Sequence, residues 1–200
     1  MANIEQLIEN LQRHGFQSKF FQTKEEAKNY ISKSVCNQTV GIGGSKTVEE
    51  LGLYEILGKK NTVSWHWKQK PADAYHQSAA ANVYISGANA ISETGEIVNI
   101  DGIGNRLSGT LFGHEKVIFI VGNNKIEPDL ECAIQRARNV AAPLNARRLG
   151  VKTPCATSEH MRCFDCDSPQ RICKSLVILW RKITGVAECE VIIIDEPLGY

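Results

Sequence analysis

Four cysteines crowd together near the C-terminus and give the chain its strongest chemical signal: Cys155, Cys163, Cys166 and Cys173, in the segment TPCATSEHMRCFDCDSPQRIC. Cys163 and Cys166 form a Cys-x2-Cys pair, which lets one turn direct two sulfurs at one centre. Four thiolates on short polar turns can hold a tetrahedral zinc ion or an iron–sulfur cluster. One pair flanked by two single cysteines suits a cluster with four separate iron corners. The spacing therefore favours a 4Fe-4S cluster, with zinc as the alternative.

Two metal-free alternatives remain, namely four reduced thiols or two disulfides. Residues 1–16 carry charges throughout and lack an apolar core of signal-peptide length, so we expect a cytoplasmic protein, where disulfides are rare. Plain buried thiols are disfavoured because the neighbouring residues are polar or charged. These neighbours are Glu159, His160, Arg162, Asp165, Asp167 and Arg171. The remaining cysteines, Cys36, Cys132 and Cys189, stand alone and are interpreted as packing residues.

A second candidate site is the glycine-rich loop from Gly41 to Thr47, which follows an apolar run and opens a helical pattern. Its glycines allow close backbone approach, its hydroxyls and amides can hold an anion, and Lys46 can neutralise one. The spacing matches neither the dinucleotide fingerprint nor the Walker loop. Anion binding and a simple tight turn with a helix cap both remain open. The candidate ligand-binding residues of this loop are Gly41, Gly43, Gly44, Ser45, Lys46 and Thr47.

Other polar turns follow predicted strands and are expected to meet this loop. Glu93, in Ser92-Glu93-Thr94-Gly95, is the candidate catalytic residue, as a nucleophile or general base, with an exposed hairpin acid as the alternative. Arg106 and Lys125 are candidates to clamp a carboxylate or phosphate. Asn105 and Asn123 lie beside them in the same turns. Together these residues predict a site for a small anionic metabolite.

The elements that must position these residues alternate between helices and strands. Apolar spacing predicts a helix over residues 4–14, and Thr23 with Glu26 forms a capping-box pattern for a second helix. Helices are also expected from Val48 to Leu57 and after Pro71 and Pro128. Buried strands are predicted at residues 39–42, 83–85, 117–121 and 191–194, and a hairpin strand at residues 96–100. This order predicts an α/β fold with a mostly parallel sheet covered by helices on both faces.

Length and charge limit the classes of function. The chain has 200 residues, which fits one domain spanning 1–200 with the cysteine-rich segment 153–175 inside it. The net charge is +1 and no basic run occurs, so nucleic acid is not an expected partner. No apolar stretch reaches membrane-spanning length, so no membrane association is expected. The oligomeric state, including a homo-oligomer, is open.

Several blocks together resemble the LUD-domain (lactate utilisation) family, in particular its LutC/YkgG-like branch. The blocks are VGIGGSKTVEELGL, ISETGEIVNIDGIGNR, VGNNKIEPDLECAIQRARNVAAPLNARRL, the cysteine segment and DEPLGY. The resemblance implies the NagB/RpiA/CoA transferase-like fold, in which the glycine loop after a strand holds a phosphate or a CoA-linked group. Class I CoA transferases use a glutamate in a Ser-Glu-x-Gly setting, which Ser92–Gly95 resembles over four residues only.

The resemblance also implies a part in oxidising L-lactate to pyruvate, together with companion iron–sulfur or oxidoreductase subunits. Many family members of this size lack the cysteine segment. The leading hypothesis is thus an iron–sulfur protein that acts in electron transfer or as an accessory subunit of a lactate-oxidising oxidoreductase. One alternative is an isomerase- or CoA-transferase-like enzyme with structural zinc. Another is a non-catalytic protein that senses a metabolite or the redox state.

Overall fold

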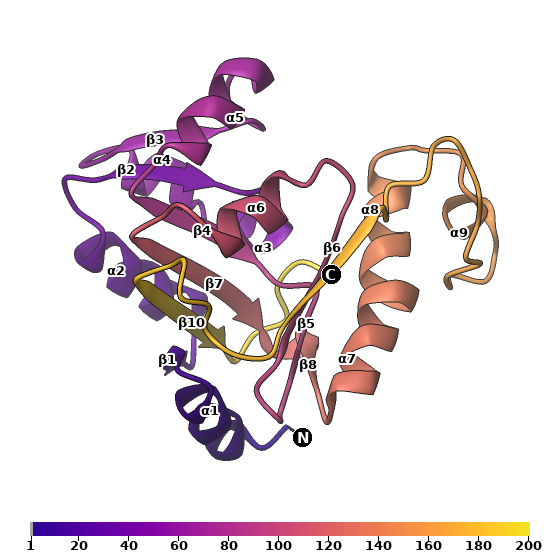
Figure 1. Cartoon of the computed structure of the whole chain (residues 1–200), viewed down its shortest axis with the longest axis horizontal. Coiled ribbons are helices and arrows are strands. Elements are labelled where there is room, and N and C mark those ends of the chain that lie inside the picture. Colours follow the sequence, from indigo (N-terminus) through magenta and orange to yellow (C-terminus); the bar gives the residue numbers. More distant parts are fainter. Residues whose placement is uncertain (1) are drawn as a thin grey trace.

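The computed structural model describes residues 2–200, which form two sheets with helices around them (Figure 1). The main sheet has six strands, all parallel, in the spatial order β1-β10-β7-β4-β2-β3. Its strands are β1 (Gln17–Phe21), β2 (Thr39–Ile42), β3 (Thr62–Trp65), β4 (Val83–Gly87), β7 (Lys116–Gly122) and β10 (Glu188–Ile194). This confirms the predicted α/β fold with a parallel sheet.

The second sheet has four strands in the order β8-β5-β6-β9. Its strands are β5 (Ala90–Ser92), β6 (Ile97–Asp101), β8 (Ile126–Glu127) and β9 (Ser175–Leu179). The predicted hairpin strand is β6, which pairs antiparallel with both β5 and β9. The cysteine segment thus lies between helix-forming sequence and an edge strand of this smaller sheet.

Helices connect most of the strands. They are α1 (Ile4–Arg13), α2 (Lys24–Ser34), α3 (Lys46–Glu50), α4 (Leu53–Leu57), α5 (Pro71–Ala79), α6 (Asn105–Leu111), α7 (Leu130–Arg136), α8 (Ala142–Arg148) and α9 (Pro154–Thr157). A 3-10 turn, η1 (Asn123–Lys125), follows β7, and a π-helical segment, η2 (Ala137–Ala141), joins α7 to α8. Within residues 2–200, the structure contains no helix with the length and apolar character needed to cross a membrane.

Local sequence explains where most helices begin. The predicted capping box of α2 is present, since the Thr23 side chain accepts from the Glu26 backbone while the Glu26 side chain accepts from the Thr23 backbone. The helix expected from Val48 to Leu57 is instead divided into α3 and α4. Gly52 takes a left-handed conformation with φ of 64° at the break, a conformation that glycine adopts without steric cost. The helix expected directly after Pro128 begins at Leu130, because Asp129 provides the N-cap by accepting from the Cys132 amide at 2.8 Å.

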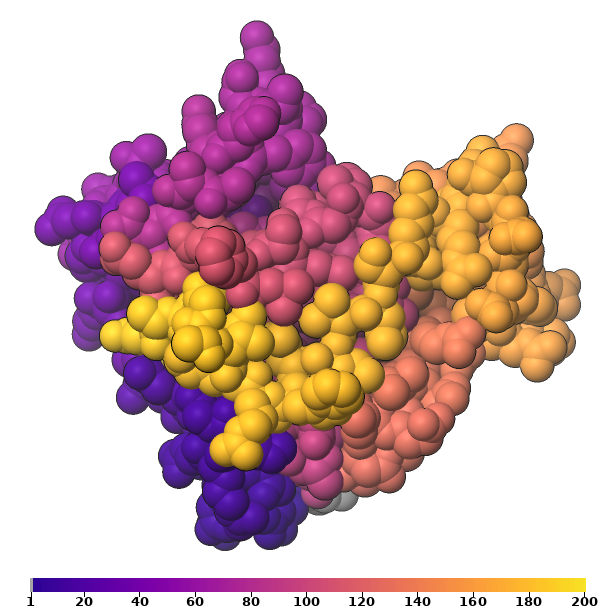
Figure 2. All heavy atoms as spheres, in the orientation of Figure 1, coloured from indigo at the N-terminus to yellow at the C-terminus, as the bar shows by residue number. Residues whose placement is uncertain are grey.

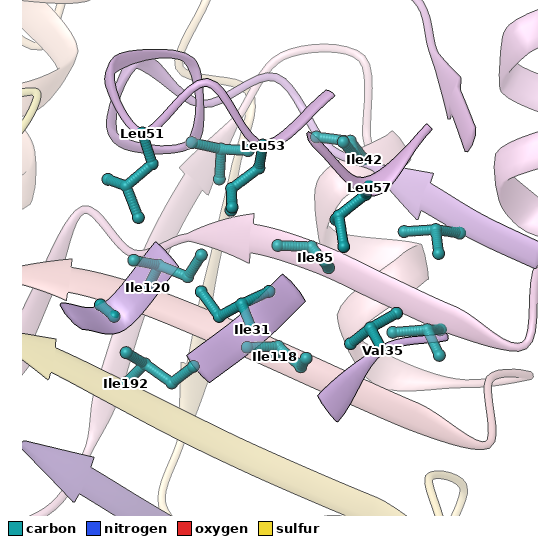
Figure 3. Close-up of a cluster of buried hydrophobic side chains, with 14 of the residues drawn as sticks. Ile31, Val35, Ile42, Leu51, Leu53, Leu57, Ile85, Ile118, Ile120 and Ile192 are labelled. Carbon is teal, nitrogen blue, oxygen red and sulfur yellow. The ribbon is translucent and has the colours of Figure 1, made fainter. Parts of the chain in front are cut away.

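Apolar side chains cover both faces of the main sheet. On one face, residues of β2, β4, β7 and β10 pack against α2, α3 and α4, as Figure 3 shows for Ile31, Leu53, Ile118 and Ile192. On the other face, a second cluster joins the main sheet to α1 and to one side of the smaller sheet. A third cluster packs the opposite side of the smaller sheet against α7 and η2. These layers hold the carboxyl ends of the parallel strands at one edge.

The cysteine segment projects at one side of the molecule. In Figure 2 it is the orange region beyond α8, separated by a notch from the magenta region of β3 and α5. Residues 158–174 form no helix or strand. Apart from the short helix α9, the segment is therefore irregular between α8 and β9.

Candidate functional site

A cavity of about 410 Å³ opens where the carboxyl ends of β2, β3 and β4 face the start of α6, the end of α8 and the cysteine segment. Ligands of open α/β sheets collect at this edge because loops converge there. Of the residues predicted from the sequence, six line this pocket: Gly44, Ser45, Lys46, Asn105, Arg106 and Lys125. Three of the expected loops therefore do meet in one place.

The glycine loop forms one wall through Gly44, Ser45 and Lys46. A Cβ atom on Gly44 would lie 3.2 Å from the Trp67 ring, so only glycine fits there without displacing a neighbour. The Ser45 hydroxyl caps α3 by accepting from the Val48 amide at 3.3 Å. Gly41, Gly43 and Thr47 lie behind this wall and support it instead of lining the pocket.

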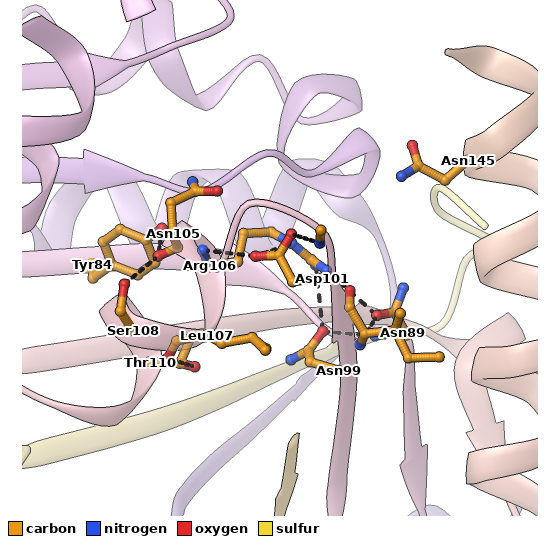
Figure 4. A network of polar contacts seen from close by, with 12 residues as sticks. Tyr84, Asn89, Asn99, Asp101, Asn105, Arg106, Leu107, Ser108, Thr110 and Asn145 are labelled. Carbon is orange, nitrogen blue, oxygen red and sulfur yellow. Dashed lines mark hydrogen bonds and ion pairs between the residues drawn. The ribbon is translucent and has the colours of Figure 1, made fainter. Parts of the chain in front are cut away.

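Arg106 is held by a polar network at the start of α6 (Figure 4). Its side chain bonds to the Asn99 amide oxygen at 3.4 Å and to the Ile100 carbonyl, and its Nε lies 4.0 Å from the Asp101 carboxylate. The same carboxylate accepts from the Arg106 backbone amide at 3.0 Å. Because several partners fix this guanidinium beside the pocket, it is preorganised to meet an anion.

His66 and Trp67, which follow β3, provide an aromatic side of the pocket. The His66 ring stacks on Tyr75 with centroids 4.8 Å apart, and the Arg148 guanidinium lies 4.7 Å from the Trp67 ring centroid. Burial lowers the pKa of His66, an effect that Asp101 opposes and Arg106 reinforces. The imidazole is therefore largely neutral near pH 7.

Several of these lining residues escaped the sequence prediction. They are His66, Trp67, Asn89, Asp101, Asn145, Arg148, Arg171 and Tyr200. The sequence Trp65-His66-Trp67 directly follows a short β-branched run, and that is the signal by which His66 and Trp67 could have been found. Asn145, Arg148 and Tyr200 reach the pocket from α8 and the chain end, and no local pattern places them there.

Lys125 is the buried basic residue of the site, with 4% of its surface exposed. Its Nζ donates to the Thr47 hydroxyl at 2.8 Å. Burial, together with the charges of Arg136 and Arg106, lowers its pKa to about 7, and Glu50 opposes this effect. Near neutral pH a large fraction of this amine is therefore uncharged.

The pocket has an excess of basic side chains. Among the described lining residues, six are basic and one, Asp101, is acidic. The basic residues are Lys46, Arg106, Lys125, Arg148, Arg171 and Lys174. Lys46 pairs with Glu49, and Arg171 lies 3.3 Å from Asp165, so these two charges are partly compensated. The remaining positive charge suits an anionic ligand.

Glu93 and Asn123 do not line the pocket. The Glu93 carboxylate accepts from the Asn3 amide at 3.0 Å, and the Asn123 side chain donates to Asp195 at 3.0 Å. The expected grouping of these two residues with the glycine loop is therefore wrong. The physical reason for Glu93 is that β5 belongs to the smaller sheet, so the turn after it lies at the far end from the pocket-lining Asn89.

The cysteine segment forms part of the pocket wall. Residues 169–172 and Lys174, which surround Cys173, all line the cavity. Arg171 joins the two features, because its guanidinium donates to the carbonyls of Cys166 at 2.8 Å and Cys173 at 2.9 Å. The cysteine segment and the pocket are therefore adjacent.

The four cysteines are free and partly exposed. Asp165, between Cys163 and Cys166, takes a φ of 46°, and its amide donates to the Cys163 sulfur at 3.4 Å. This turn and the thiol donor set fit a metal-binding Cys-x2-Cys pair. Across residues 2–200, however, no three His, Cys, Asp or Glu side chains are gathered as a metal-binding group. A shared metal centre would therefore require the segment to close around it.

Comparison with known proteins places the chain in a family. A model of the LUD domain matches residues 4–194, which includes the whole cysteine segment. The chain is similar in structure to a DUF162 family protein from Deinococcus radiodurans, with a TM-score of 0.57 and 15% sequence identity. The match covers 96% of this chain and 95% of that one, and at this identity it supports the fold alone. No curated protein matches the chain. The match over nearly the whole chain shows that this protein belongs to the LUD-domain family, which is associated with lactate utilisation.

Proposed function

We propose that this LUD-domain protein binds a small carboxylic acid, L-lactate or its oxidation product pyruvate, in the pocket beside α6. We further propose that it takes part in oxidising L-lactate, or a related 2-hydroxy acid, as an iron–sulfur electron-transfer or accessory component. One observation carries the proposal: a pocket with six basic side chains shares a wall with the segment that contains the four cysteines. Anion binding and electron transfer would then occur side by side.

Cys155, Cys163, Cys166 and Cys173 would hold a 4Fe-4S cluster, and the cluster would supply one-electron transfer. Nearby arginines support a negatively charged centre there. The Arg138 guanidinium lies 3.8 Å from the Cys163 sulfur and 3.4 Å from the Asp165 carboxylate. Electrostatic interaction with Cys173 raises the pKa of the Arg171 guanidinium. Hydrogen bonds to cluster sulfurs and nearby positive charge are two ways in which proteins tune such centres.

Purification without oxygen tests the cluster. Protein that carries it should be brown and show a broad absorption band near roughly 400 nm that dithionite bleaches. Colourless protein with zinc bound would contradict the electron-transfer role and favour a structural site. Protein with neither iron nor zinc would contradict a metal centre altogether.

The volume of the pocket supports one alternative, an enzyme of the isomerase or transferase type. A cavity of about 410 Å³ lies within the range of roughly 300–1,000 Å³ found for larger ligands, and a three-carbon acid would fill only part of it. Calorimetric titration with lactate, pyruvate, inorganic phosphate and a sugar phosphate would separate the two ideas. Tighter binding of the phosphate compounds would favour the alternative.

Arg106 provides a direct test of the anion site. The Arg106→Ala variant is expected to weaken carboxylate binding by about 1.5–3 kcal/mol, because a charge-assisted hydrogen bond is lost. Arg106→Lys keeps the charge but cannot reproduce the fixed guanidinium, so we expect an intermediate loss. Arg13→Ala is the matched control, since Arg13 is exposed and its ion pair within residues 2–200 is with Glu9 of the same helix. Pyruvate titration by calorimetry measures all three, and equal affinities for wild type and Arg106→Ala would contradict the site.

A further inference from the structure

Lys125 is more deeply buried than a lysine needs to be if it only binds an anion through its charge. It ends the 3-10 turn after β7 and lines the pocket although only 4% of its surface is exposed. Within residues 2–200, no carboxylate forms an ion pair with its amine. Its hydrogen-bond partner is the neutral hydroxyl of Thr47, at 2.8 Å. Clamping lysines are normally solvated or paired, because an isolated buried ammonium is costly.

The surrounding backbone fixes the position of this amine. The Thr47 hydroxyl donates to the Leu198 carbonyl at 3.2 Å, so its lone pairs are directed at Lys125. Gly199 covers the pair, and a Cβ atom there would lie 2.7 Å from the Thr47 hydroxyl and 3.2 Å from Nζ. The Gly199 amide is in turn held by the Glu50 carboxylate at 2.9 Å. The Lys125 amine is thus enclosed on this side, and the residue also lines the pocket.

The charges that face Lys125 add to the effect of burial in lowering the pKa of its amine. Arg136, which is buried and donates to the Asn89 and Asn124 carbonyls, faces it from α7. Arg106 faces it from α6. Burial, Arg136 and Arg106 together lower the pKa of the amine to about 7, while Glu50 of α3 opposes them. An unprotonated, desolvated lysine amine is a nucleophile toward carbonyl groups.

We propose that Lys125 is a catalytic residue whose amine forms an imine with the carbonyl carbon of a 2-oxo acid bound in the pocket. The inference rests on the proposed carboxylate site, which would hold the acid by Arg106 and leave the adjacent carbonyl to Lys125. A C–N bond forms at the carbonyl carbon and the C–O bond breaks. The oxygen leaves as water together with the two hydrogens of the neutral amine, so the step needs no oxidant or reductant. The imine would make the carbon next to it more acidic.

Reductive trapping tests the imine. The protein is incubated with pyruvate or glyoxylate, reduced with sodium cyanoborohydride and analysed by intact mass and by peptide mapping. We expect one adduct, on the peptide that contains Lys125, and none with L-lactate, which lacks a carbonyl. Lys125→Arg should lose the adduct, whereas Lys33→Arg, at an exposed position near the end of α2, should keep it. Adducts spread over exposed lysines, or no adduct at all, would overturn the proposal.

A second measurement needs no variant. Imine formation should accelerate exchange of the pyruvate methyl hydrogens with deuterium, which proton NMR follows in wild-type protein. Calorimetry separates the two proposals. Pyruvate binding without trapping or exchange would defeat the imine alone. Absence of both pyruvate and lactate binding would defeat the carboxylate site and the imine together.

Discussion

Lys125→Met is expected to make the folded protein more stable at pH 6, by on the order of 1–4 kcal/mol. The wild-type chain must bury an amine that pairs with no carboxylate among residues 2–200, and at pH 6 that amine is charged in both the folded and the unfolded chain. Methionine fills a similar space with no charge to desolvate. The lost hydrogen bond to Thr47 offsets part of the gain, by about 1 kcal/mol.

The stabilisation should depend on pH in a defined direction. The folded pKa of Lys125 is about 7, below the unfolded value of about 10.4, so between these values the unfolded chain binds more protons. The wild-type free energy of unfolding should therefore rise as the pH increases from 7 to 10. Below pH 7 the penalty is complete, and above the unfolded pKa it is absent. The advantage of Lys125→Met should be largest at pH 6 and nearly gone at pH 10.

Urea unfolding at several pH values measures this difference. Lys33→Met is the control, because an exposed lysine should leave both the stability and its slope with pH nearly unchanged. Parallel pH profiles for wild type and Lys125→Met would show that the amine is not desolvated. The same variant should lose the imine, so stability and chemistry should change in opposite directions. Such a trade-off is expected where a protein maintains an unfavourable group for its function.

Much of the fold follows from local sequence patterns. The parallel strands β2, β4, β7 and β10 each contain a short apolar run, as expected where a sheet is covered on both faces. Arg106 and Lys125 were identified because each follows a strand in a polar turn. The same rule wrongly placed Glu93 at the pocket. Sequence alone does not reveal that β5, the strand before Glu93, belongs to the smaller sheet.

The pocket-lining residues that the sequence did not predict are brought to the pocket mainly by long-range packing. Arg148 approaches from α8, where its guanidinium meets the Tyr200 hydroxyl at 2.7 Å. Trp67 reaches the same place from β3 and stacks on Trp65. The Arg148 guanidinium also lies 4.7 Å from the Trp67 ring centroid, a contact between residues far apart in the chain, and no local pattern around Arg148 places it there. Only the folded arrangement of the two sheets and α8 brings them together.

Serine substitution at Cys163 or Cys166 is expected to abolish metal incorporation. A tetra-thiolate centre loses a ligand that a serine hydroxyl replaces poorly, since the hydroxyl is a harder donor and is not readily deprotonated. Cys155→Ser and Cys173→Ser should each lower the iron content as well. Cys36→Ser and Cys132→Ser are matched controls, because these thiols are partly exposed but lie outside the segment. Iron analysis after purification without oxygen provides the measurement, and unchanged iron content in all four variants would contradict the shared centre.

Loss of the metal centre should also weaken ligand binding in the pocket, because Arg171 contacts both the cysteine segment and the cavity. No three of the potential ligands between residues 2 and 200 are gathered as a metal-binding group, so a shared centre would draw the thiols together and restrain residues 158–174. Arg171 donates to the carbonyls of Cys166 and Cys173 while lining the cavity, so closure of the segment should fix one wall of the pocket. Chelation should concentrate proteolytic cutting between Lys152 and Lys174 and weaken pyruvate binding, while Cys36→Ser protein behaves as wild type. An unchanged digestion pattern would show that the segment keeps its order without metal, and the pocket wall would then be independent of the cysteines.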